Sequence, residues 1–340
     1  MPYRYRAFGL SIAADAPIPG MLAGENPALA GNLSASAVED ASRCDLRIDL
    51  ARDDAWSSEA TDILFRELPE DATGCTLQIW RDLHSRGFRL LFGDGSEFLI
   101  DREGGRIAAR WNSNVGVDGM SVYLLGPVLG FALRLRGTTC LHASAVSDGT
   151  DALAVVAGGG RGKSTTAAAF ARRGVAVLTD DLLALREDES VFWAQPAYPR
   201  IRLWPRAVKG LFGSEDALPR ITPDDPAWDK RFVDLSAEPF RFCSREVPLA
   251  ALYVGVHDEG AGRPVLEEVS GRETLLTMLS NSYSHRMPGR EMRAGDFDRL
   301  ARLAQHVPLR RFRMGEGFGH LDELCTLLLE DCRACARAGA

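Results

Sequence analysis

The stretch Val155–Ala168 (VVAGGGRGKSTTAA) places glycines, a lysine and hydroxyl residues between two apolar runs. Glycines let backbone N–H groups surround an anion, and a helix that begins after them directs its partial positive charge to the same place. Lys163 would then reach the β- and γ-phosphates of a nucleotide, and the Ser164 hydroxyl would reach a magnesium ion. Ala157 replaces the first glycine of the pattern G-x-x-x-x-G-K-[ST], but it only ends the entering strand. The residues predicted to hold the nucleotide are Gly158, Gly159, Gly160, Arg161, Gly162, Lys163, Ser164 and Thr165.

Two acids end the next apolar run, VAVLTDD, at Asp180 and Asp181. An apolar strand that delivers acids beside a phosphate loop presents a metal ligand and a base. We expect one acid to hold magnesium and the other to accept a proton from an incoming hydroxyl. Each pattern also has a plain alternative: the loop as a glycine-rich turn without a ligand, and the acids as an ordinary strand-end turn.

Three further side chains are candidates for the same site. His142, in LHASAV, lies on the strand before the glycine loop. A lone histidine is more often a core residue, but next to the two aspartates it would tune or relay a proton. Arg200 and Arg202 share one face of an extended segment, and guanidinium groups suit a transferring phosphoryl group. A surface strand with salt-bridged arginines explains this pair equally well.

The elements that must position these residues fall into two regions. Short alternating segments, with turn signals at Gly93–Ser96 and Arg102–Gly105, predict a β-rich domain over residues 1–118. From Met120, a buried helix with Pro127 inside it and apolar strands around the glycine loop predict an α/β domain over 119–340. The overall class is α/β, or α+β for the whole chain. Residues 193–242 are rich in proline and arginine and predict surface loops, and residues 308–313 (PLRRFR) predict an edge strand.

Composition limits the function classes. The net charge of -7 argues against a nucleic-acid-binding protein, which needs a concentrated positive face. No signal peptide is visible, and the longest apolar run, Val122–Leu133, is too short to span a bilayer, so we expect a cytoplasmic protein without a membrane partner. The seven scattered cysteines suit a reducing compartment. The C-x-x-C spacing of Cys332 and Cys335 predicts a frayed helix end and not a metal or redox site.

Taken together and in order, the segments LHASAV, GGGRGKST, LTDDLLAL and PRIRLWP resemble the HPr serine kinase/phosphorylase family. The N-terminal YRAFGLSI and PIPGM make the resemblance strongest to HPr-kinase-like enzymes found beside lasso-peptide biosynthesis genes. It covers about residues 120–330 and implies a P-loop kinase domain, similar also to the nucleotide domain of phosphoenolpyruvate carboxykinases.

The resemblance also implies roles for single residues. His142 matches the histidine of the family's strand, Asp180 the aspartate that deprotonates the acceptor serine, and Asp181 its neighbour on the metal side. The family's Leu-Glu-Ile-Arg-Gly signature is PRIRL here, with Arg202 in the arginine position and Arg200 where the glutamate would be. That replacement leaves magnesium with fewer protein carboxylates and weighs against phosphorylase activity and against HPr as the substrate.

The sequence therefore predicts an ATP- and Mg²⁺-dependent kinase for a serine or threonine hydroxyl of a peptide or small protein, such as the C-terminal serine of a lasso-peptide precursor. Two alternatives stay open: a kinase for a small-molecule hydroxyl, and a nucleotide-binding regulatory module without transfer. A carboxykinase-type lyase is disfavoured, because neither a second metal site nor an arginine cluster is recognisable. The N-terminal domain could dock a peptide or mediate homo-oligomer formation.

Overall fold

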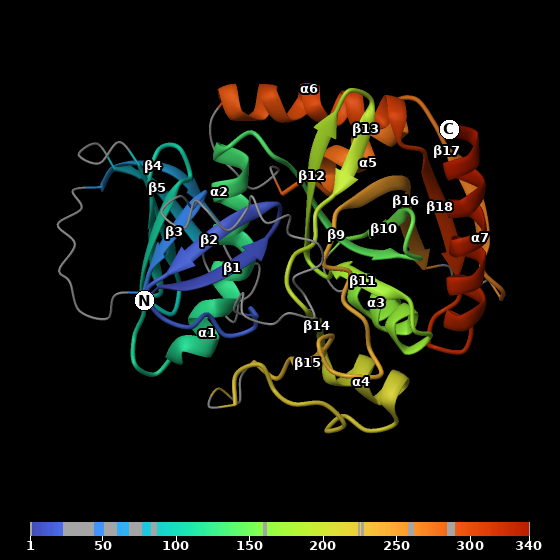
Figure 1. Ribbon diagram of the computed structural model, residues 1–340, viewed down its shortest axis with the longest axis horizontal. Coiled ribbons are helices and arrows are strands. Elements are labelled where there is room, and N and C mark those ends of the chain that lie inside the picture. Colours follow the sequence, from blue (N-terminus) through green and yellow to red (C-terminus); the bar gives the residue numbers. More distant parts are fainter. Residues whose placement is uncertain are drawn as a thin grey trace, which may run out of the picture. The chain divides into compact units, whose positions relative to one another are not determined.

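The computed structural model of the 340-residue chain describes residues 2–22, 44–50, 60–67, 77–82, 87–158, 162–223, 225, 228–257, 262–283 and 290–339 (Figure 1). Contacts group the chain into two compact units, Met1–Thr138 with Arg286–Asp296, and Thr139–His285 with Phe297–Ala340. The boundary predicted at residue 118 falls near the start of a helix. The two units divide after that helix, at Thr138.

The first unit contains a single eight-stranded sheet. Its strands, in their order across the sheet, are β1 (Tyr3–Ala7), β2 (Leu10–Ala14), β3 (Leu46–Asp49), β8 (Arg106–Arg110), β7 (Glu97–Ile100), β6 (Phe88–Phe92), β5 (Leu77–Asp82) and β4 (Ala60–Arg66). Antiparallel pairs β6–β7 and β7–β8 are joined at the two predicted turns, which confirms the meander expected for the end of this region. The strands alternate buried and more exposed residues, as expected for a sheet with one face in the core.

The predicted buried helix is a continuous run of α1 (Gly116–Tyr123), η2 (Leu124–Val128) and α2 (Leu129–Leu135). Pro127 lies in the π-helical turn, where the missing N–H of proline interrupts the regular ladder. Phe131 packs edge-on against Phe88 of β6 at 5.0 Å between ring centroids, so the helix belongs to the core of this unit. The run of 20 residues is longer than the apolar segment seen in the sequence and is apolar enough to cross a membrane, but 67% of its most apolar window is buried.

The second unit is built on mixed strands. In order they are β10 (Ala152–Val156), β9 (Thr139–Ser147), β12 (Leu182–Asp188), β13 (Val191–Ala194), β16 (Val247–His257), β18 (Leu309–Met314) and β17 (Val265–Val269), with β11 (Ala176–Thr179) also beside β9. Because β16 pairs with β13 and also, in parallel, with β10, the strand path closes on itself. The mixed α/β class is confirmed, while the P-loop kinase arrangement stays a prediction.

Helices surround these strands. They are α3 (Lys163–Arg172), α4 (Pro205–Phe212), α5 (Arg272–Ser280), α7 (Leu321–Gly339) and, from Phe297 onward, α6 (Arg290–His306). The alanine-rich α3 packs against β9 and α7, and α7 packs against β16 (Figure 1). The small side chains of α3 share a core cluster with Phe170 of the same helix and with Leu324 and Leu328 of α7. Gly174, with φ of 77°, ends α3 as predicted.

The structure corrects the prediction for residues 193–242. They hold the end of β13, helix α4 and a separate two-stranded ribbon of β14 (Arg200–Leu203) and β15 (Arg231–Asp234), not only loops. Ile201, Leu203 and Val233 are at most 1% exposed, so one face of the ribbon is a core face.

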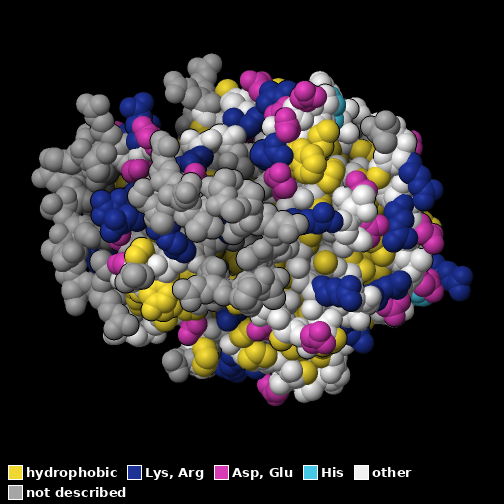
Figure 2. All heavy atoms as spheres, in the orientation of Figure 1, with side chains coloured by type: hydrophobic (Ala, Val, Ile, Leu, Met, Phe, Trp, Pro, Cys, Tyr) yellow, Lys and Arg dark blue, Asp and Glu magenta, His cyan; other side chains and the backbone are white. Residues whose placement is uncertain are grey.

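The prediction of an edge strand at residues 308–313 is wrong. β18 lies between β16 and β17, and β17 is the strand at the end of the sheet. Arg310 and Arg313 of β18 form ion pairs with Glu268 and Glu267 of β17, at 3.0 and 2.9 Å. Figure 2 shows dark-blue and magenta side chains interspersed where β17, β18 and α7 lie in Figure 1. The arginine alternation therefore reflects an acidic neighbouring strand and not an unpaired edge.

The cysteine spacing near the C-terminus lies within α7, which continues to Gly339, so the predicted frayed helix end is wrong. Cys332 is 5% exposed, and burial raises the pKa of its thiol to about 12. A buried thiol of this kind is a poor nucleophile.

Candidate functional site

The candidate site forms where two strands end on either side of β9. β10 and β11 both pair antiparallel with the same residues of β9, one on each side, so their carboxyl ends point in the same direction. Val156 lies opposite Ala143, and Thr179 lies opposite Ala145. The glycine loop after β10 and the acids after β11 therefore flank the part of β9 that carries His142. The sequence order alone suggested this proximity, and the strand register produces it.

The glycine loop leads into α3 through Gly162. This residue caps the helix with φ of 93°, a left-handed conformation that glycine adopts without the steric cost of a Cβ. The N–H and the hydroxyl of Thr166 both donate to the Gly162 carbonyl, at 2.8 and 3.0 Å, which fixes the first turn. Thr165 is half-buried in the same turn. The predicted ligands Gly159, Gly160 and Arg161 lie outside the described residues.

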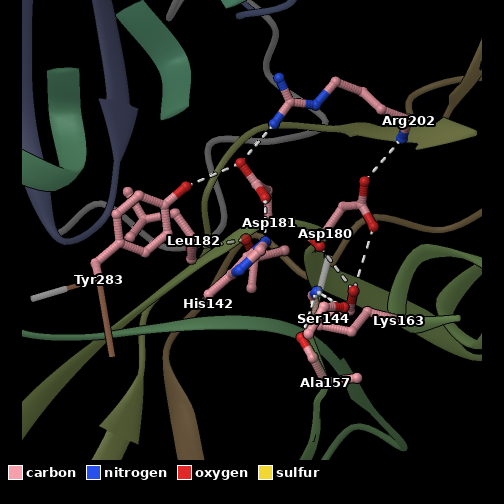
Figure 3. A network of polar contacts seen from close by, with 11 residues as sticks. His142, Ser144, Ala157, Lys163, Asp180, Asp181, Leu182, Arg202 and Tyr283 are labelled. Atoms are coloured by element: carbon pink, nitrogen blue, oxygen red, sulfur yellow. Dashed lines mark hydrogen bonds and ion pairs between the residues drawn. The ribbon is translucent and has the colours of Figure 1, made fainter. Parts of the chain in front are cut away.

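Lys163 is the first residue of α3, and it is only 7% exposed. Its ammonium donates to the carbonyl oxygens of Ala157, at 2.8 Å, and Gly158, at 3.4 Å (Figure 3). Burial lowers the pKa of Lys163, and the charges of Asp181 and Asp180 partly offset that effect. The ammonium is thus held at the start of the loop by neutral oxygens, with its charge balanced only from a distance.

Asp180 is buried and bonded by groups of the surrounding backbone and side chains. The backbone N–H of Arg202 donates to its Oδ2 at 2.8 Å, and the Ser144 hydroxyl donates to its carbonyl at 2.7 Å and to its Oδ1 at 3.2 Å (Figure 3). Burial raises the pKa of Asp180, and the hydrogen bonds from Arg202 and from the Ser164 side chain oppose this only in part. The carboxyl therefore holds a proton more readily than an ordinary aspartate.

Asp181 has the opposite environment. Its Oδ2 accepts hydrogen bonds from Arg202 Nη2 at 2.7 Å and from the Tyr283 hydroxyl at 3.0 Å, and its Oδ1 lies 3.0 Å from His142 Nε2 (Figure 3). Burial by itself would raise the pKa of Asp181, but Arg202 and His142 outweigh it and hold the pKa well below its ordinary value. Asp181 is therefore a permanent anion surrounded by donors.

Tyr283 reaches the site from a segment that pairs with the edge of β9. The backbone N–H of His142 donates to the Asn281 carbonyl at 2.7 Å, and the backbone N–H of Tyr283 donates to the Cys140 carbonyl at 3.1 Å. The Tyr283 and His142 rings meet edge-on, 5.7 Å apart between centroids. Burial and the charge of Asp181 raise the pKa of Tyr283 well above its ordinary value, so the phenol remains a donor.

The two predicted arginines have different surroundings. Both lie on β14, and the register pairs Arg200 with Asp234 and Arg202 with Phe232. The side chain of Arg202 binds Asp181, whereas the guanidinium of Arg200 stacks over the Phe232 ring at 4.0 Å. The structure therefore brings Arg202 to the two aspartates and gives Arg200 an aromatic partner across the ribbon.

Three residues of this site were not singled out from the sequence. Ser144 lies two positions after His142, and the alternation of a strand would have placed both on one face. Tyr283 follows Asp181 by 102 positions, and no local pattern connects them. Lys230 precedes β15, and its charge interacts with those of both aspartates and of Lys163.

Among the residues of the site that the structure describes, one hydroxyl oxygen fits magnesium. Magnesium prefers hard oxygen ligands and keeps several waters and substrate phosphates. The Ser164 hydroxyl, in the first turn of α3 and hydrogen-bonded to Asp180, offers such an oxygen. Asp181, predicted as the metal ligand, already has its oxygens engaged by three side chains, so it does not fit that role here. Within the described part of the chain, no group of three or more His, Cys, Asp or Glu residues could hold a metal ion.

No family model matches the sequence, and no curated protein matches it. Among solved structures, the chain is similar to the HPr(Ser) kinase/phosphatase from Coxiella burnetii, with 11% sequence identity and a TM-score of 0.34 over 58% of this chain and 98% of that chain. This is a distant likeness to a kinase, and a TM-score at this level carries no argument about chemistry. Any functional assignment therefore depends on the residues of the site themselves.

Proposed function

We propose that the second unit is an ATP- and Mg²⁺-dependent phosphotransferase that phosphorylates a serine or threonine hydroxyl of a peptide or protein. The observation that carries the proposal is that two adjacent aspartates beside the buried Lys163 have pKa values shifted in opposite directions. The pKa of Asp180 is raised, and the pKa of Asp181 is held down by Arg202 and His142. Neighbouring acids whose pKa values are driven apart are typical of sites that assign one to proton transfer and the other to charge.

The binding role falls to the start of α3. The first backbone N–H groups of a helix have no partner within it and, with the helix dipole, favour an anion. Lys163 adds a buried ammonium whose present hydrogen-bond partners are neutral carbonyls, and Ser164 would hold magnesium through its hydroxyl oxygen. Bound ATP with magnesium supplies the γ-phosphoryl group and neutralises part of its charge. These residues orient the triphosphate toward Asp180.

The transfer role falls to Asp180. It would accept the proton of the acceptor hydroxyl while the hydroxyl oxygen bonds to the γ-phosphorus and the bond to the bridging oxygen breaks, so that ADP leaves. Arg202 would stabilise the charge on the transferring oxygens with N–H groups other than the one bound to Asp181. Asp181 fixes the guanidinium, and His142 and Tyr283 fix Asp181. His142, expected to tune or relay a proton beside the two aspartates, therefore acts on Asp181.

The identity of the acceptor is the most specific part of the proposed function. The sequence resemblance to HPr-kinase-like enzymes of lasso-peptide biosynthesis makes the C-terminal serine of a precursor peptide the first acceptor to test. We place the enzyme in the cytoplasm, where ATP and the peptide would meet. Two alternatives are a kinase for a small molecule and a regulatory module without transfer. With labelled ATP, the first would label a small hydroxyl compound, and the second would transfer no label.

The test incubates the purified full chain with γ-labelled ATP, magnesium and precursor peptides that end in serine or, as a control, in alanine. We expect label on the serine peptide alone. Asp180→Asn should reduce transfer by about 10²–10⁴-fold, the usual range for a lost general base. Asp188→Asn is the matched control, because Asp188 is an exposed acid at the end of β12 that pairs with Arg186. Full transfer by Asp180→Asn would remove the base assignment. Label only on a small hydroxyl compound would replace the peptide as acceptor, and ATP binding without any transfer would favour the regulatory module.

A further inference from the structure

Lys230 lies beside the ribbon that carries Arg202. The register pairs Leu203 of β14 with Arg231 of β15, so the next residues outward, Trp204 and Lys230, lie opposite one another. Alternation along a strand places Trp204 on the same face as Arg202, and residues opposite one another in a pair share a face. The face of the ribbon that presents Arg202 to Asp181 therefore also presents Lys230.

Two indole rings hold the Lys230 ammonium. It lies 4.9 Å from the centroid of the Trp204 ring and 5.7 Å from that of Trp228. Cation–π contacts of this kind restrict an ammonium without cancelling its charge. Among the residues that the structure describes, no carboxylate lies within ion-pair distance of Lys230. The lysine is thus positioned in advance while its charge stays available to a ligand.

The charges around the two aspartates do not balance. Lys163, Arg202 and Lys230 are three cations whose charges act on Asp180 and Asp181. Arg202 already forms an ion pair with Asp181, at 2.7 Å, so one of the three cations has its partner. The Lys163 ammonium donates to two backbone carbonyls, and the Lys230 ammonium lies over two indole rings, so both are held by neutral groups. Within the described ranges neither ammonium has a carboxylate at ion-pair distance, and a bound anion would supply that partner.

We propose that Lys230 is a second phosphate-binding lysine, which contacts the terminal phosphate of a bound polyphosphate from the Arg202 side of the site, while Lys163 contacts it from α3. The inference rests on the proposed function and deepens it by naming a residue that would distinguish a triphosphate from a diphosphate. Lys163, the first residue of α3, would reach both the β- and the γ-phosphate, so it does not by itself distinguish the two nucleotides. Lys230 shares a face with Arg202, beside the acid proposed to accept the proton, so it is placed for the group that is transferred.

Calorimetric titrations of the full chain with Mg-ATP, Mg-ADP and inorganic tripolyphosphate test this role. We expect Lys230→Met to weaken binding of ATP and of tripolyphosphate by about tenfold, as for one lost phosphate contact near a protein surface, and binding of ADP much less. Lys230→Arg should recover most of the loss, because it keeps the charge and the ring contacts. Lys209→Met is the matched control, since Lys209 lies on α4 with an exposed side chain and should not affect any ligand.

The outcomes separate this inference from the proposed function. If Lys163→Met abolishes ATP binding while Lys230→Met binds like the wild type, the role of Lys230 is overturned and the proposed function stands. A wild-type protein that does not bind ATP overturns the proposed function and the lysine's role with it. Equal losses for ATP and ADP, or a loss for ATP without one for tripolyphosphate, also overturn it; the latter would indicate that the lysine and its tryptophans bind the base. Should Lys230→Met not fold, Lys230→Arg and Lys230→Gln make the same comparison.

Discussion

His142 Nε2 lies 3.0 Å from Asp181 Oδ1, so the histidine of β9 serves the second of the two adjacent aspartates. The guanidinium of Arg202 binds the same carboxylate, whereas Asp180 receives only the backbone N–H of Arg202 and hydroxyl groups. Adjacent residues of one turn thus have different environments: one carboxylate is bound by a guanidinium, an imidazole and a phenol, and the other is buried among neutral donors. Substitutions of Asp180 and Asp181 should therefore change the stability of the protein in opposite directions.

Asp180→Asn should make the protein more stable at neutral pH. The folded protein raises the pKa of Asp180 above its ordinary value of 3.8, so between the two values the folded state binds more protons than the unfolded state. The contribution of Asp180 to the free energy of unfolding is therefore present at low pH and is lost as the pH rises through the pKa of the folded state. Asparagine never ionises, so its advantage should be largest near pH 7 and vanish below about pH 4. Thermal unfolding between pH 4 and pH 8 measures it, at about 2–4 °C for each kcal/mol regained.

The matched variant for that measurement is Asp188→Asn, at an exposed end of β12, which should change stability by no more than about 0.5 kcal/mol. An Asp180→Asn protein that is less stable than the wild type at every pH would contradict the assignment, since the carboxylate would then be a stabilising group.

Asp181→Asn should destabilise the protein. Arg202 would lose its anionic partner while its side chain remains only 11% exposed, and a buried charge left without a partner costs about 3 kcal/mol or more. Because the pKa of Asp181 is held low, its contribution is present above the ordinary value of 3.8 and is lost as the pH falls toward the folded pKa. The difference in unfolding temperature from the wild type should therefore be largest near neutral pH and shrink in acid. An unchanged unfolding temperature at pH 7 would show that the pair contributes nothing.

Most of the predicted site residues that the structure brings together come from one continuous stretch, from β9 through the loop and α3 to Asp181, and Arg202 joins them from β14. There the apolar runs, the glycines and the acids follow one another at short range, and the register of β9 with its two neighbours brings them together. Tyr283 and Lys230 join from segments that are distant in sequence, and nothing in their local pattern marks them. Only the pairing of residues 281–283 with β9 and the pairing of β14 with β15 define their positions.

The errors in the fold have a similar origin. β14 and β15 have four residues each, which is too short for alternation to be distinguished from a loop among prolines and arginines. The alternating arginines of β18 are compatible with a solvated edge or with an acidic neighbouring strand, and only the pairing with β17 decides between them. Local patterns specify which face of a strand is buried, but not which strand lies next to it.

Tyr283→Phe should reduce phosphoryl transfer more than it reduces stability. Loss of the hydroxyl removes one of the donors to Asp181, at a cost of about 1 kcal/mol, and leaves Arg202 less firmly placed. Tyr253→Phe is the matched control, because its buried hydroxyl donates to Asp331 and to the Leu328 carbonyl, away from the loop and the two aspartates. Both variants should lose similar stability in thermal unfolding, and only Tyr283→Phe should lose kcat. Equal loss of kcat in both variants would assign Tyr283 a purely structural role.

Ser144→Ala should shift the pH profile of transfer. The Ser144 hydroxyl lies 3.2 Å from Asp180 Oδ1 and donates to it, which favours the charged carboxylate. Removing this donor raises the pKa of Asp180 further, so the acid limb of kcat/KM should move to higher pH, while rates well above that limb stay close to those of the wild type. Ser147→Ala is the control on the same strand, because Ser147 is equally buried and accepts a hydrogen bond from Gly149 N–H instead. Profiles measured from pH 5 to pH 9 compare the two. A shift toward lower pH, or the same shift in both variants, would show that Asp180 is not the group that titrates in catalysis.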